Sequence, residues 1–196
     1  MQNIKVVLMG DVGSGKTTIS DIYVKNAFDI YTPSTIGSAY QTKKIKVDIG
    51  NETKIITCEI WDTAGSERFR SLVPMYCRNA HLTLLVFDLN NRESFENIPQ
   101  WYDIVMSKQN GNNPTFLLIG NKEDLAPKVS KTEIDKMCKK YGFQYHQISC
   151  LSMDVAKKLH YMFTKNVTNI HKMLENTTTH LIDFMDEEPS KGCCFN

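Results

Sequence analysis

The chain has 196 residues, of which 41% are hydrophobic, and a formal net charge of +1 at pH 7. This length suits one domain with a single core, and the near-neutral charge gives no indication of nucleic-acid binding. No apolar run is long enough to span a membrane. Because Met1–Asn3 leads almost directly into the first strand, we expect no signal peptide and a cytoplasmic protein. The six cysteines lack the paired spacing of a zinc site, so we expect reduced thiols.

The hydrophobic pattern predicts alternating strands and helices along the chain. Strands are predicted at Ile4–Met9, Tyr40–Ile49, Lys54–Trp61, Leu82–Leu89, Thr115–Gly120 and Phe143–Ser149, and helices at Gly15–Lys25, Glu93–Lys108, Lys131–Tyr141 and Ser152–Leu174. The turn Asp48–Asn51 favours an antiparallel hairpin. The other strands favour an α/β fold, with a mostly parallel six-stranded sheet and helices on both faces. Residues 1–174 form the predicted domain and residues 175–196 a flexible tail.

The most specific motif is a glycine-rich turn between the first strand and the first helix, Gly10–Thr17 (GDVGSGKT). Glycines let backbone N–H groups approach phosphates, and the helix N-terminus adds the positive end of its dipole. Lys16 is predicted to reach the β- and γ-phosphates, and Thr17 to offer its hydroxyl to Mg²⁺. The remaining phosphate contacts are assigned to backbone groups and hydroxyls at Gly13, Ser14, Gly15 and Thr18.

Two further positions are predicted to complete the phosphate and metal site. Asp62 ends the third strand, where an acid can hold the Mg²⁺ shell through water, and the N–H of Gly65 can then sense a γ-phosphate. Thr35 lies between the first helix and the second strand. Its hydroxyl would complete the Mg²⁺ coordination only when a γ-phosphate is present, which makes a switch between ordered and disordered states.

The segment Asn121–Asp124 (NKED) follows a buried strand and is predicted to choose the base. The carboxylate of Asp124 can accept from both guanine N1–H and the exocyclic amine, a donor pair that adenine lacks. Asn121 would tie this loop to the phosphate loop, and the stem of Lys122 would cover one face of the ring. Phe28 is predicted either to pack edge-on against the guanine or to be an ordinary core residue.

With these motifs, the chain resembles a Ras-superfamily small GTPase, and within that superfamily a Rab, over residues 3–174 and the last four residues. The segments that carry the resemblance are Ile36–Tyr40, Glu59–Phe69, Tyr76–Ala80, Leu85–Asp88, and Glu93–Ile98 with Trp101. Ile36–Tyr40 and Ser71–Tyr76 are most similar to the early-endosomal Rab subgroup. The resemblance implies a three-layer P-loop GTPase fold, GTP, GDP and Mg²⁺ as ligands, and a nucleotide-regulated switch in vesicle trafficking, in particular endocytic trafficking.

The resemblance also implies partners and a location. The partners would be an exchange factor, a GTPase-activating protein, a GDP-dissociation inhibitor, an escort protein and effectors. The chain itself would be a monomer that cycles from the cytoplasm to the cytosolic face of endosomal or vesicle membranes. An aromatic triad of Tyr40, Trp61 and Tyr76 would shape the effector surface, with ordinary core packing as the alternative.

The C-terminal Cys193 and Cys194 resemble the doubly geranylgeranylated ending of Rabs, with a single prenyl group on Cys193 as the rival. The preceding residues, 183–191, contain four acidic residues against one lysine and lack a polybasic patch that would bind acidic lipid. Since one lipid chain alone binds a membrane only marginally, stable docking requires both cysteines to be modified or a separate protein receptor.

The chain departs from the family's pattern at several site positions. Most relatives carry Gln where Ser66 stands, and Ser is too short to orient the attacking water. Val12 replaces a small residue beside the γ-phosphate. The family's guanine loop appears here as Ser149, Cys150 and Leu151, in which the Cys150 N–H can still donate to guanine and Leu151 covers the ring only partly.

These departures predict slow intrinsic GTP hydrolysis, with Lys16, Thr35, Gly65 and Ser66 as the catalytic set. An activating protein that supplies Arg and Gln in trans would restore turnover. One alternative is a largely GTP-locked membrane scaffold that binds GTP and barely hydrolyses it. The other rival, a P-loop ATPase or kinase, is disfavoured by Asn121–Asp124.

Overall fold

The computed structural model of this chain describes residues 3–29, 35–50, 52–66, 72–109 and 113–186. Six strands form one sheet in the order β2-β3-β1-β4-β5-β6. Their bounds are β1 (Asn3–Met9), β2 (Ser38–Ile49), β3 (Glu52–Thr63), β4 (Leu82–Asp88), β5 (Thr115–Asn121) and β6 (Gln144–Gln147). Among the strand pairs that the structure describes, β2–β3 alone is antiparallel. The predicted α/β fold with a mostly parallel sheet is therefore confirmed.

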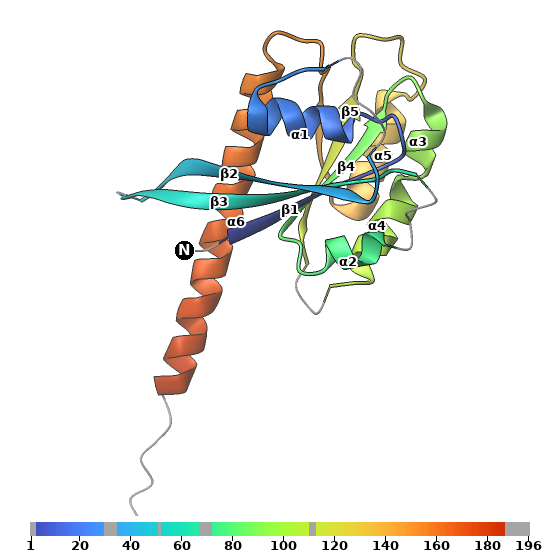
Figure 1. The fold of residues 1–196 in the computed structure, drawn as a ribbon. Helices are drawn as coiled ribbons and strands as arrows, with labels where there is room; N and C mark the ends of the chain where they lie inside the picture. The colour runs from blue at the N-terminus through green and yellow to red at the C-terminus, as the bar shows by residue number, and fades with distance from the viewer. Residues whose placement is uncertain (1–2, 30–34, 51, 67–71, 110–112, 187–196) are drawn as a thin grey trace, which may run out of the picture.

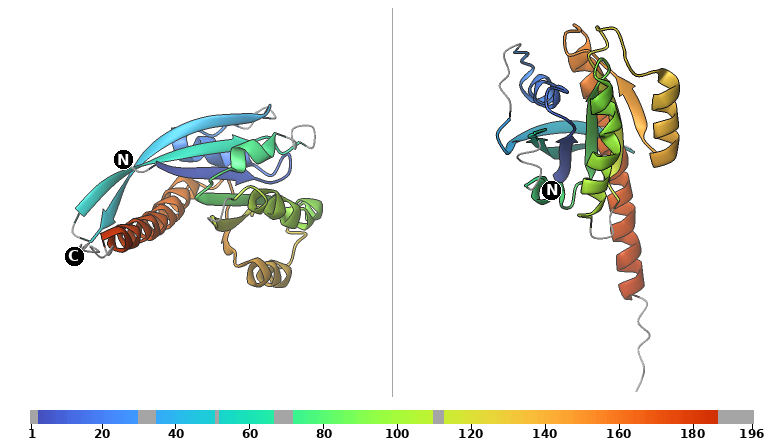
Figure 2. Two further views of the ribbon diagram at one scale, coloured as in Figure 1. Left: turned by 90° about the horizontal axis from the view of Figure 1, so that it is seen from below. Right: turned by 90° about the vertical axis from the view of Figure 1, so that its right-hand side faces the viewer.

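Helices cover both faces of this sheet (Figure 1). Their bounds are α1 (Lys16–Lys25), α2 (Val73–Cys77), α3 (Arg92–Glu96), α4 (Ile98–Met106), α5 (Lys131–Tyr141) and α6 (Val155–Asp186). Residues of α1 and α6 share one buried cluster with the sheet, and residues of α2, α3, α4 and α5 share the other. The two perpendicular views in Figure 2 show the sheet between these two helical layers.

The central strands are buried because each face meets a different helical layer. In β4, Leu84 and Val86 pack in the α1–α6 cluster, whereas Leu85 and Phe87 pack in the cluster of the other four helices. This alternation follows from the two-residue period of a strand, which sends successive side chains to opposite faces. A continuous apolar run such as Leu82–Phe87 is therefore needed here, and the carboxyl ends of β1, β4 and β5 meet at one edge of the sheet.

The predicted single helix Glu93–Lys108 is wrong in one respect, because the segment forms two helices that meet at Asn97. Pro99 lies in the first turn of α4, where its missing N–H costs nothing. In a continuous helix that N–H would have been needed for an intrahelical bond. The five-residue helix α2 was not predicted.

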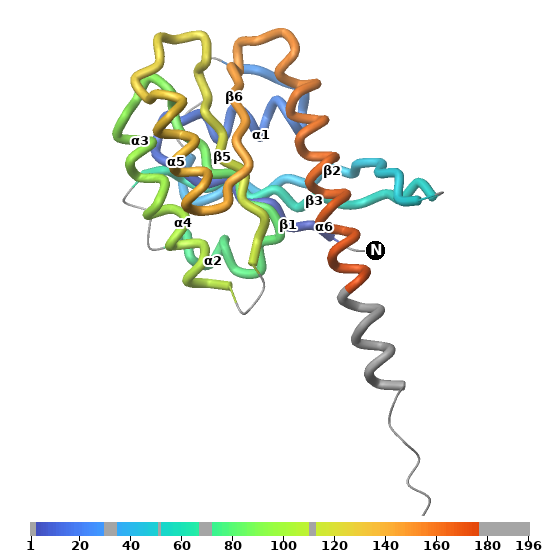
Figure 3. Tube along the Cα trace, turned by 180° about the vertical axis from the view of Figure 1, so that it is seen from behind, coloured from blue at the N-terminus to red at the C-terminus, as the bar shows by residue number. Residues whose placement is uncertain are grey.

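The last helix also differs from the prediction, since α6 begins at Val155 and continues to Asp186, beyond the predicted end at Leu174. Seen from behind in Figure 3, α6 lies over the β2–β3 side of the sheet. The Lys54 ammonium on β3 pairs with the Glu175 carboxylate on α6 at 2.5 Å, so regular structure extends into the predicted tail. Cys193 and Cys194 lie outside the described residues. Among the helices within the described ranges, none is both long and apolar enough to cross a membrane.

Candidate functional site

The loop between β1 and α1 folds against the ends of two neighbouring strands. Gly10 has φ +140°, and a Cβ there would lie 2.0 Å from the Val86 carbonyl oxygen on β4. Gly15 has φ +96°, and its Cβ would lie 2.1 Å from Asn121 Nδ2 at the end of β5. Both positions combine a left-handed backbone with a close approach, so glycine is required at each for steric reasons.

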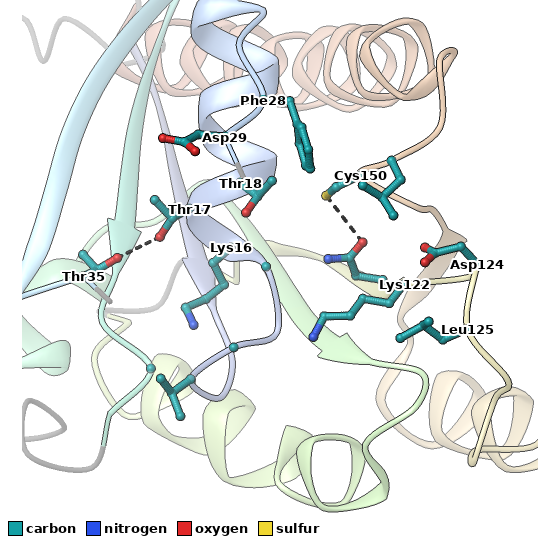
Figure 4. A pocket seen from close by; sticks show the side chains of 16 residues that line it. Lys16, Thr17, Thr18, Phe28, Asp29, Thr35, Lys122, Asp124, Leu125 and Cys150 are labelled. Carbon is teal, nitrogen blue, oxygen red and sulfur yellow. Dashed lines mark hydrogen bonds between the residues drawn. The ribbon is translucent and has the colours of Figure 1, made fainter. Parts of the chain in front are cut away.

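A cavity of about 460 Å³ opens along this loop. It brings together most of the predicted binding residues, from segments far apart in the sequence: Gly13, Gly15, Lys16, Thr17, Thr18, Phe28, Thr35, Gly65, Asn121, Lys122, Asp124, Cys150 and Leu151. Figure 4 shows Lys16, Thr17 and Thr35 at one end of this cavity and Phe28, Asp124, Leu125 and Cys150 at the other.

Three residues of the cavity wall lie outside the binding set that the sequence predicts. Asp29 and Leu125 follow directly after Phe28 and Asp124, but no motif marks either residue. Val12, which the sequence singled out only as a departure from the family, is 56% exposed in the wall of the same cavity. In the other direction, Ser14, Asp62, Ser66 and Ser149 are not part of the wall and stand behind it or beside it.

At the first end of the cavity, Lys16 is 5% exposed and donates to the Asp11 carbonyl oxygen at 2.8 Å. Burial lowers the pKa of Lys16 to about 8, although the nearby carboxylates of Asp62 and Asp11 act in the opposite direction. Gly65 also closes on this loop, because a Cβ on it would lie 2.6 Å from Lys16 Nζ and 2.4 Å from the Val12 nitrogen. A buried ammonium beside a backbone of this kind is suited to an anionic group.

Oxygen atoms from three elements converge next to Lys16. The hydroxyls of Thr17 and Thr35 share a hydrogen bond of 2.7 Å, and the Thr35 hydroxyl donates to Asp62 Oδ2 at 3.5 Å. Asp62 is fully buried, and its Oδ1 has no hydrogen-bond partner among the described residues. Burial raises the pKa of this carboxyl, while the Thr17 hydroxyl and the Lys16 ammonium lower it. Hydroxyl and carboxylate oxygens with one buried oxygen unpaired fit a hard cation such as Mg²⁺.

The opposite end of the cavity is built by the loops after β5 and β6. Asn121 Nδ2 donates to the Ser14 carbonyl oxygen at 2.9 Å, which joins the loop after β5 to the phosphate loop. The Ser149 hydroxyl donates to Asp124 Oδ1. Lys122 has φ +63°, and its ammonium pairs with the Asp88 carboxylate at 2.7 Å. The Ser149 hydroxyl thereby fixes the Asp124 carboxylate at the edge of the cavity.

The rim of this end is apolar, with Phe28 47% exposed, Leu125 45% exposed and Leu151 61% exposed. Phe28 lines the cavity and belongs to neither buried cluster, so the alternative of ordinary core packing is wrong. The Cys150 thiol contacts Asn121 Oδ1 at 3.5 Å, and burial raises the pKa of this thiol to about 11. Cys150 is therefore a neutral, apolar part of the wall at physiological pH.

The aromatic triad forms a separate surface. The ring centroids of Tyr40 and Trp61 lie 4.9 Å apart, and those of Trp61 and Tyr76 lie 5.7 Å apart. Tyr40 is 52% exposed, and none of the three rings belongs to the fully buried core. Trp61 packs against the core cluster of the four smaller helices, so the triad is partly exposed on β2, β3 and α2 and rests on the core through Trp61.

Three features together define a P-loop GTPase: a mostly parallel sheet, a glycine-rich loop around a buried lysine, and the loop after β5 with the Asp124 carboxylate at the cavity. A model of the Ras family matches residues 5–172, and the chain belongs to this family of small GTPases.

The curated relatives agree with this assignment. GTP-binding protein YPT52 of Saccharomyces cerevisiae is 38% identical over 162 residues, which cover 81% of this chain and 69% of the relative. Ras-related protein RABF2b of Arabidopsis thaliana is 34% identical over 195 residues, or 98% and 95% of the two chains. Ypt/Rab-type GTPase ypt7 of Schizosaccharomyces pombe is 38% identical over 145 residues, or 71% and 69%. The chain is thus a Rab-type small GTPase that hydrolyses GTP and takes part in membrane trafficking.

Proposed function

We propose that this Rab-type GTPase is a GTP/GDP-regulated switch in endocytic vesicle trafficking whose intrinsic hydrolysis is unusually slow. The observation that carries the proposal is the single cavity that joins Lys16, Thr35 and Gly65 to the base loop at Asp124, with Val12 in its wall. The endocytic assignment is supported by the resemblance of Ile36–Tyr40 to the early-endosomal Rab subgroup.

In this proposal the phosphates lie at the Lys16 end of the cavity. Lys16 and the backbone N–H groups of Gly13–Thr18 neutralise phosphate charge. Thr17 and Thr35 would hold Mg²⁺ directly, and Asp62 would hold it through water. The metal, when bound, would supply further neutralisation of the β- and γ-phosphate oxygens. Since the Thr35 hydroxyl would hold the metal and the Gly65 N–H would contact the γ-phosphate in the GTP form alone, GTP would stabilise the order of residues 28–40 and 65–76 and with it the effector surface around Tyr40, Trp61 and Tyr76.

The base would lie between Phe28 and the loops after β5 and β6. Asp124 would accept from guanine N1–H and the exocyclic amine, and the Ser149 hydroxyl, which donates to Asp124 Oδ1, would fix the orientation of the carboxylate. The Cys150 N–H would donate to guanine O6. Leu151 would cover the ring only partly, which is consistent with its exposure of 61%.

Slow hydrolysis follows from two side chains. Ser66 is too short to orient an attacking water from the position after Gly65, and the exposed Val12 isopropyl group would crowd the space beside the γ-phosphate. A thousandfold loss of rate would correspond to about 4 kcal/mol of activation free energy.

The partners of a Rab-type GTPase are, in general, exchange factors, activating proteins, GDP-dissociation inhibitors and effectors. We further propose an escort protein, geranylgeranyl groups on Cys193 and Cys194, and a monomer that cycles between the cytoplasm and the cytosolic face of endosomal membranes. The acidic residues that precede the two cysteines support double modification, since they offer no attraction to acidic lipid.

The second candidate is a GTP-locked membrane scaffold, favoured by the combination of Val12 and Ser66. Nucleotide and intact-mass analysis of the protein taken from its own cells tests both candidates together. A switch carries mostly GDP, turns over when an activating protein is added, and shows the mass of two prenyl groups. A scaffold carries GTP that no activating protein hydrolyses, and protein that holds neither nucleotide in the presence of Mg²⁺ refutes the nucleotide site itself.

A further inference from the structure

The side chain of Asp11 is turned away from the nucleotide cavity, although Asp11 is the second residue of the phosphate loop. Asp11 is not part of the cavity wall. Its Oδ1 accepts from the Trp101 indole N–H at 2.7 Å, and its Oδ2 accepts from the Asn97 amide at 2.7 Å. Both donors come from the start of α4, 86 and 90 positions along the chain. Each carboxylate oxygen therefore has its own short, charge-assisted hydrogen bond.

The backbone of the same residue contacts two residues of the cavity wall, Lys16 and Gly65. The Asp11 carbonyl oxygen accepts from Lys16 Nζ at 2.8 Å and from the Ser14 N–H at 3.3 Å. A Cβ on Gly65 would lie 2.4 Å from the Asp11 carbonyl carbon. Asp11 thus holds the phosphate-binding ammonium with its main chain and α4 with its side chain.

The use of Asn97 is unusual for its position. Asn97 is the residue immediately before α4, where an asparagine side chain normally accepts from the helix's own N–H groups, but it makes no such cap. Its amide is instead directed to Asp11. The positive end of the α4 dipole favours the Asp11 carboxylate at this place. The local preference of Asn97 is thus overridden by a contact to the phosphate loop.

Trp101 connects Asp11 to the buried core of the protein. The indole is 1% exposed and packs in the same buried cluster as Val73 and Cys77 of α2. The far end of α4 is also joined to α2, because Gln109 Nε2 donates to the Cys77 carbonyl oxygen at 2.9 Å. A displacement of Asp11 would therefore alter the packing of α4 against α2, the helix that carries Tyr76 of the aromatic triad.

We propose that Asp11 is a positioning residue that fixes the phosphate loop on α4 through Trp101 and Asn97, and that this contact transmits the nucleotide state to Trp101. The inference rests on the proposed nucleotide site. A glycine-rich loop has many accessible conformations, and two charged hydrogen bonds restrict them before the nucleotide binds, which lowers the entropic cost of binding. Gly65, whose N–H would contact the γ-phosphate of GTP alone, lies against the Asp11 carbonyl, so GTP and GDP would place the Asp11 main chain differently, and the carboxylate on the same residue passes the change to α4.

Nucleotide release tests the positioning role. We expect Asp11→Ala to release GDP about tenfold faster at fixed Mg²⁺, equivalent to about 1.4 kcal/mol. Asp11→Asn, which keeps one acceptor oxygen, should be intermediate, and Asn97→Ala, whose side chain is half-buried, should accelerate release about threefold. Trp101→Phe combined with Asp11→Ala should release GDP no faster than Asp11→Ala alone, because both changes remove one interaction. Asp135→Ala on α5 removes an exposed carboxylate as the matched control and should leave release unchanged.

Fluorescence separates positioning from a merely structural role. The chain contains two tryptophans, so Trp61→Phe leaves Trp101 as the single emitter. Its emission should differ between the GDP form and a form with a non-hydrolysable GTP analogue, and this difference should vanish when Asp11→Ala is added. Release at the wild-type rate from Asp11→Ala, or an emission change that persists without the Asp11 carboxylate, overturns the inference. Failure of the wild-type chain to retain any guanine nucleotide refutes the proposed function instead.

Discussion

Thr17 and Thr35 share a hydrogen bond of 2.7 Å between their hydroxyl oxygens, although one lies on α1 and the other lies beyond it in the segment that leads to β2. The buried Asp62 carboxylate is within 3.5 Å of the Thr35 hydroxyl. The three side chains are therefore already gathered where a cation would replace the contact between the two hydroxyls. Thr17 is fixed by its helix, whereas Thr35 lies outside the helices and strands.

This difference between the two threonines predicts different metal phenotypes. We expect Thr17→Ala to weaken Mg²⁺ binding in both nucleotide states, and Thr35→Ala to weaken it mainly in the GTP state, by about tenfold. Mg²⁺ titrations of the release of fluorescent GDP and GTP analogues measure both. Thr132→Ala, at an exposed position on α5 outside this cavity, is the control. Equal effects of Thr35→Ala on the two states would contradict the assignment.

The rate of GTP hydrolysis tests Val12 and Ser66. We expect Ser66→Gln to raise single-turnover hydrolysis by about tenfold or more, because a longer amide side chain can orient the attacking water. Val12→Ser should also accelerate hydrolysis by relieving the crowding beside the γ-phosphate. Leu125→Met, which changes an apolar group at the base end of the cavity, is a suitable control for general effects on the cavity. If neither Ser66→Gln nor Val12→Ser is faster than wild type, the explanation of slow hydrolysis is wrong.

Base selection tests Asp124. In Asp124→Asn one acceptor oxygen becomes an amide donor, which complements xanthine better than guanine. Relative affinity for xanthosine over guanosine nucleotides should rise by at least about tenfold, or about 1.4 kcal/mol. Competition binding with a fluorescent nucleotide measures the ratio. Glu123→Gln, which alters the neighbouring exposed carboxylate, should leave the ratio unchanged, and an equal ratio in both variants would place the base elsewhere.

The link between α3 and α5 predicts a dependence of stability on pH. The Glu133 carboxylate accepts from the Ser130 hydroxyl and pairs with Arg92 at 2.5 Å, and these contacts lower its pKa from 4.5 to about 2. Since the folded pKa is below the unfolded value, the stabilisation is present above about pH 4.5 and is lost as the pH falls towards 2.

Thermal unfolding of Glu133→Gln should therefore show a lower Tm than wild type at pH 7, and the gap should narrow at pH 3. The stabilisation is small because the pair is exposed to solvent. Asp135→Asn, two positions further along the same helix, should show no such convergence. A gap of constant size at both pH values would mean that ionisation of Glu133 is not its cause.

Much of the site could be predicted because its chemistry is local. The loop Gly10–Thr17 and the segment Asn121–Asp124 each combine residue types and spacing that few other structures require. Their placement at strand ends follows from the apolar runs before them, since parallel strands end at the same edge of a sheet. The strand assignments depended on the same runs, whose length and composition favour burial on both faces.

Other features depended on contacts between distant segments. The break at Asn97 and the end of α6 at Asp186 were missed, because a periodic apolar pattern does not say where packing will interrupt or prolong a helix. For Phe28 the sequence left two alternatives, packing against the guanine or packing in the core. Its place in the cavity wall excludes the core. Leu125 and Asp29 carry no motif at all.

By itself the sequence determined the fold class and the phosphate loop and predicted a residue that would choose the base, because these depend on periodicity and on side-chain chemistry within short segments. Only the tertiary structure decided that the Asp11 carboxylate faces α4 and that the hydroxyls of Thr17 and Thr35 share a hydrogen bond. Each of these contacts joins residues whose separation along the chain says nothing about their distance in space. That distance is set by the packing of two helical layers on one sheet.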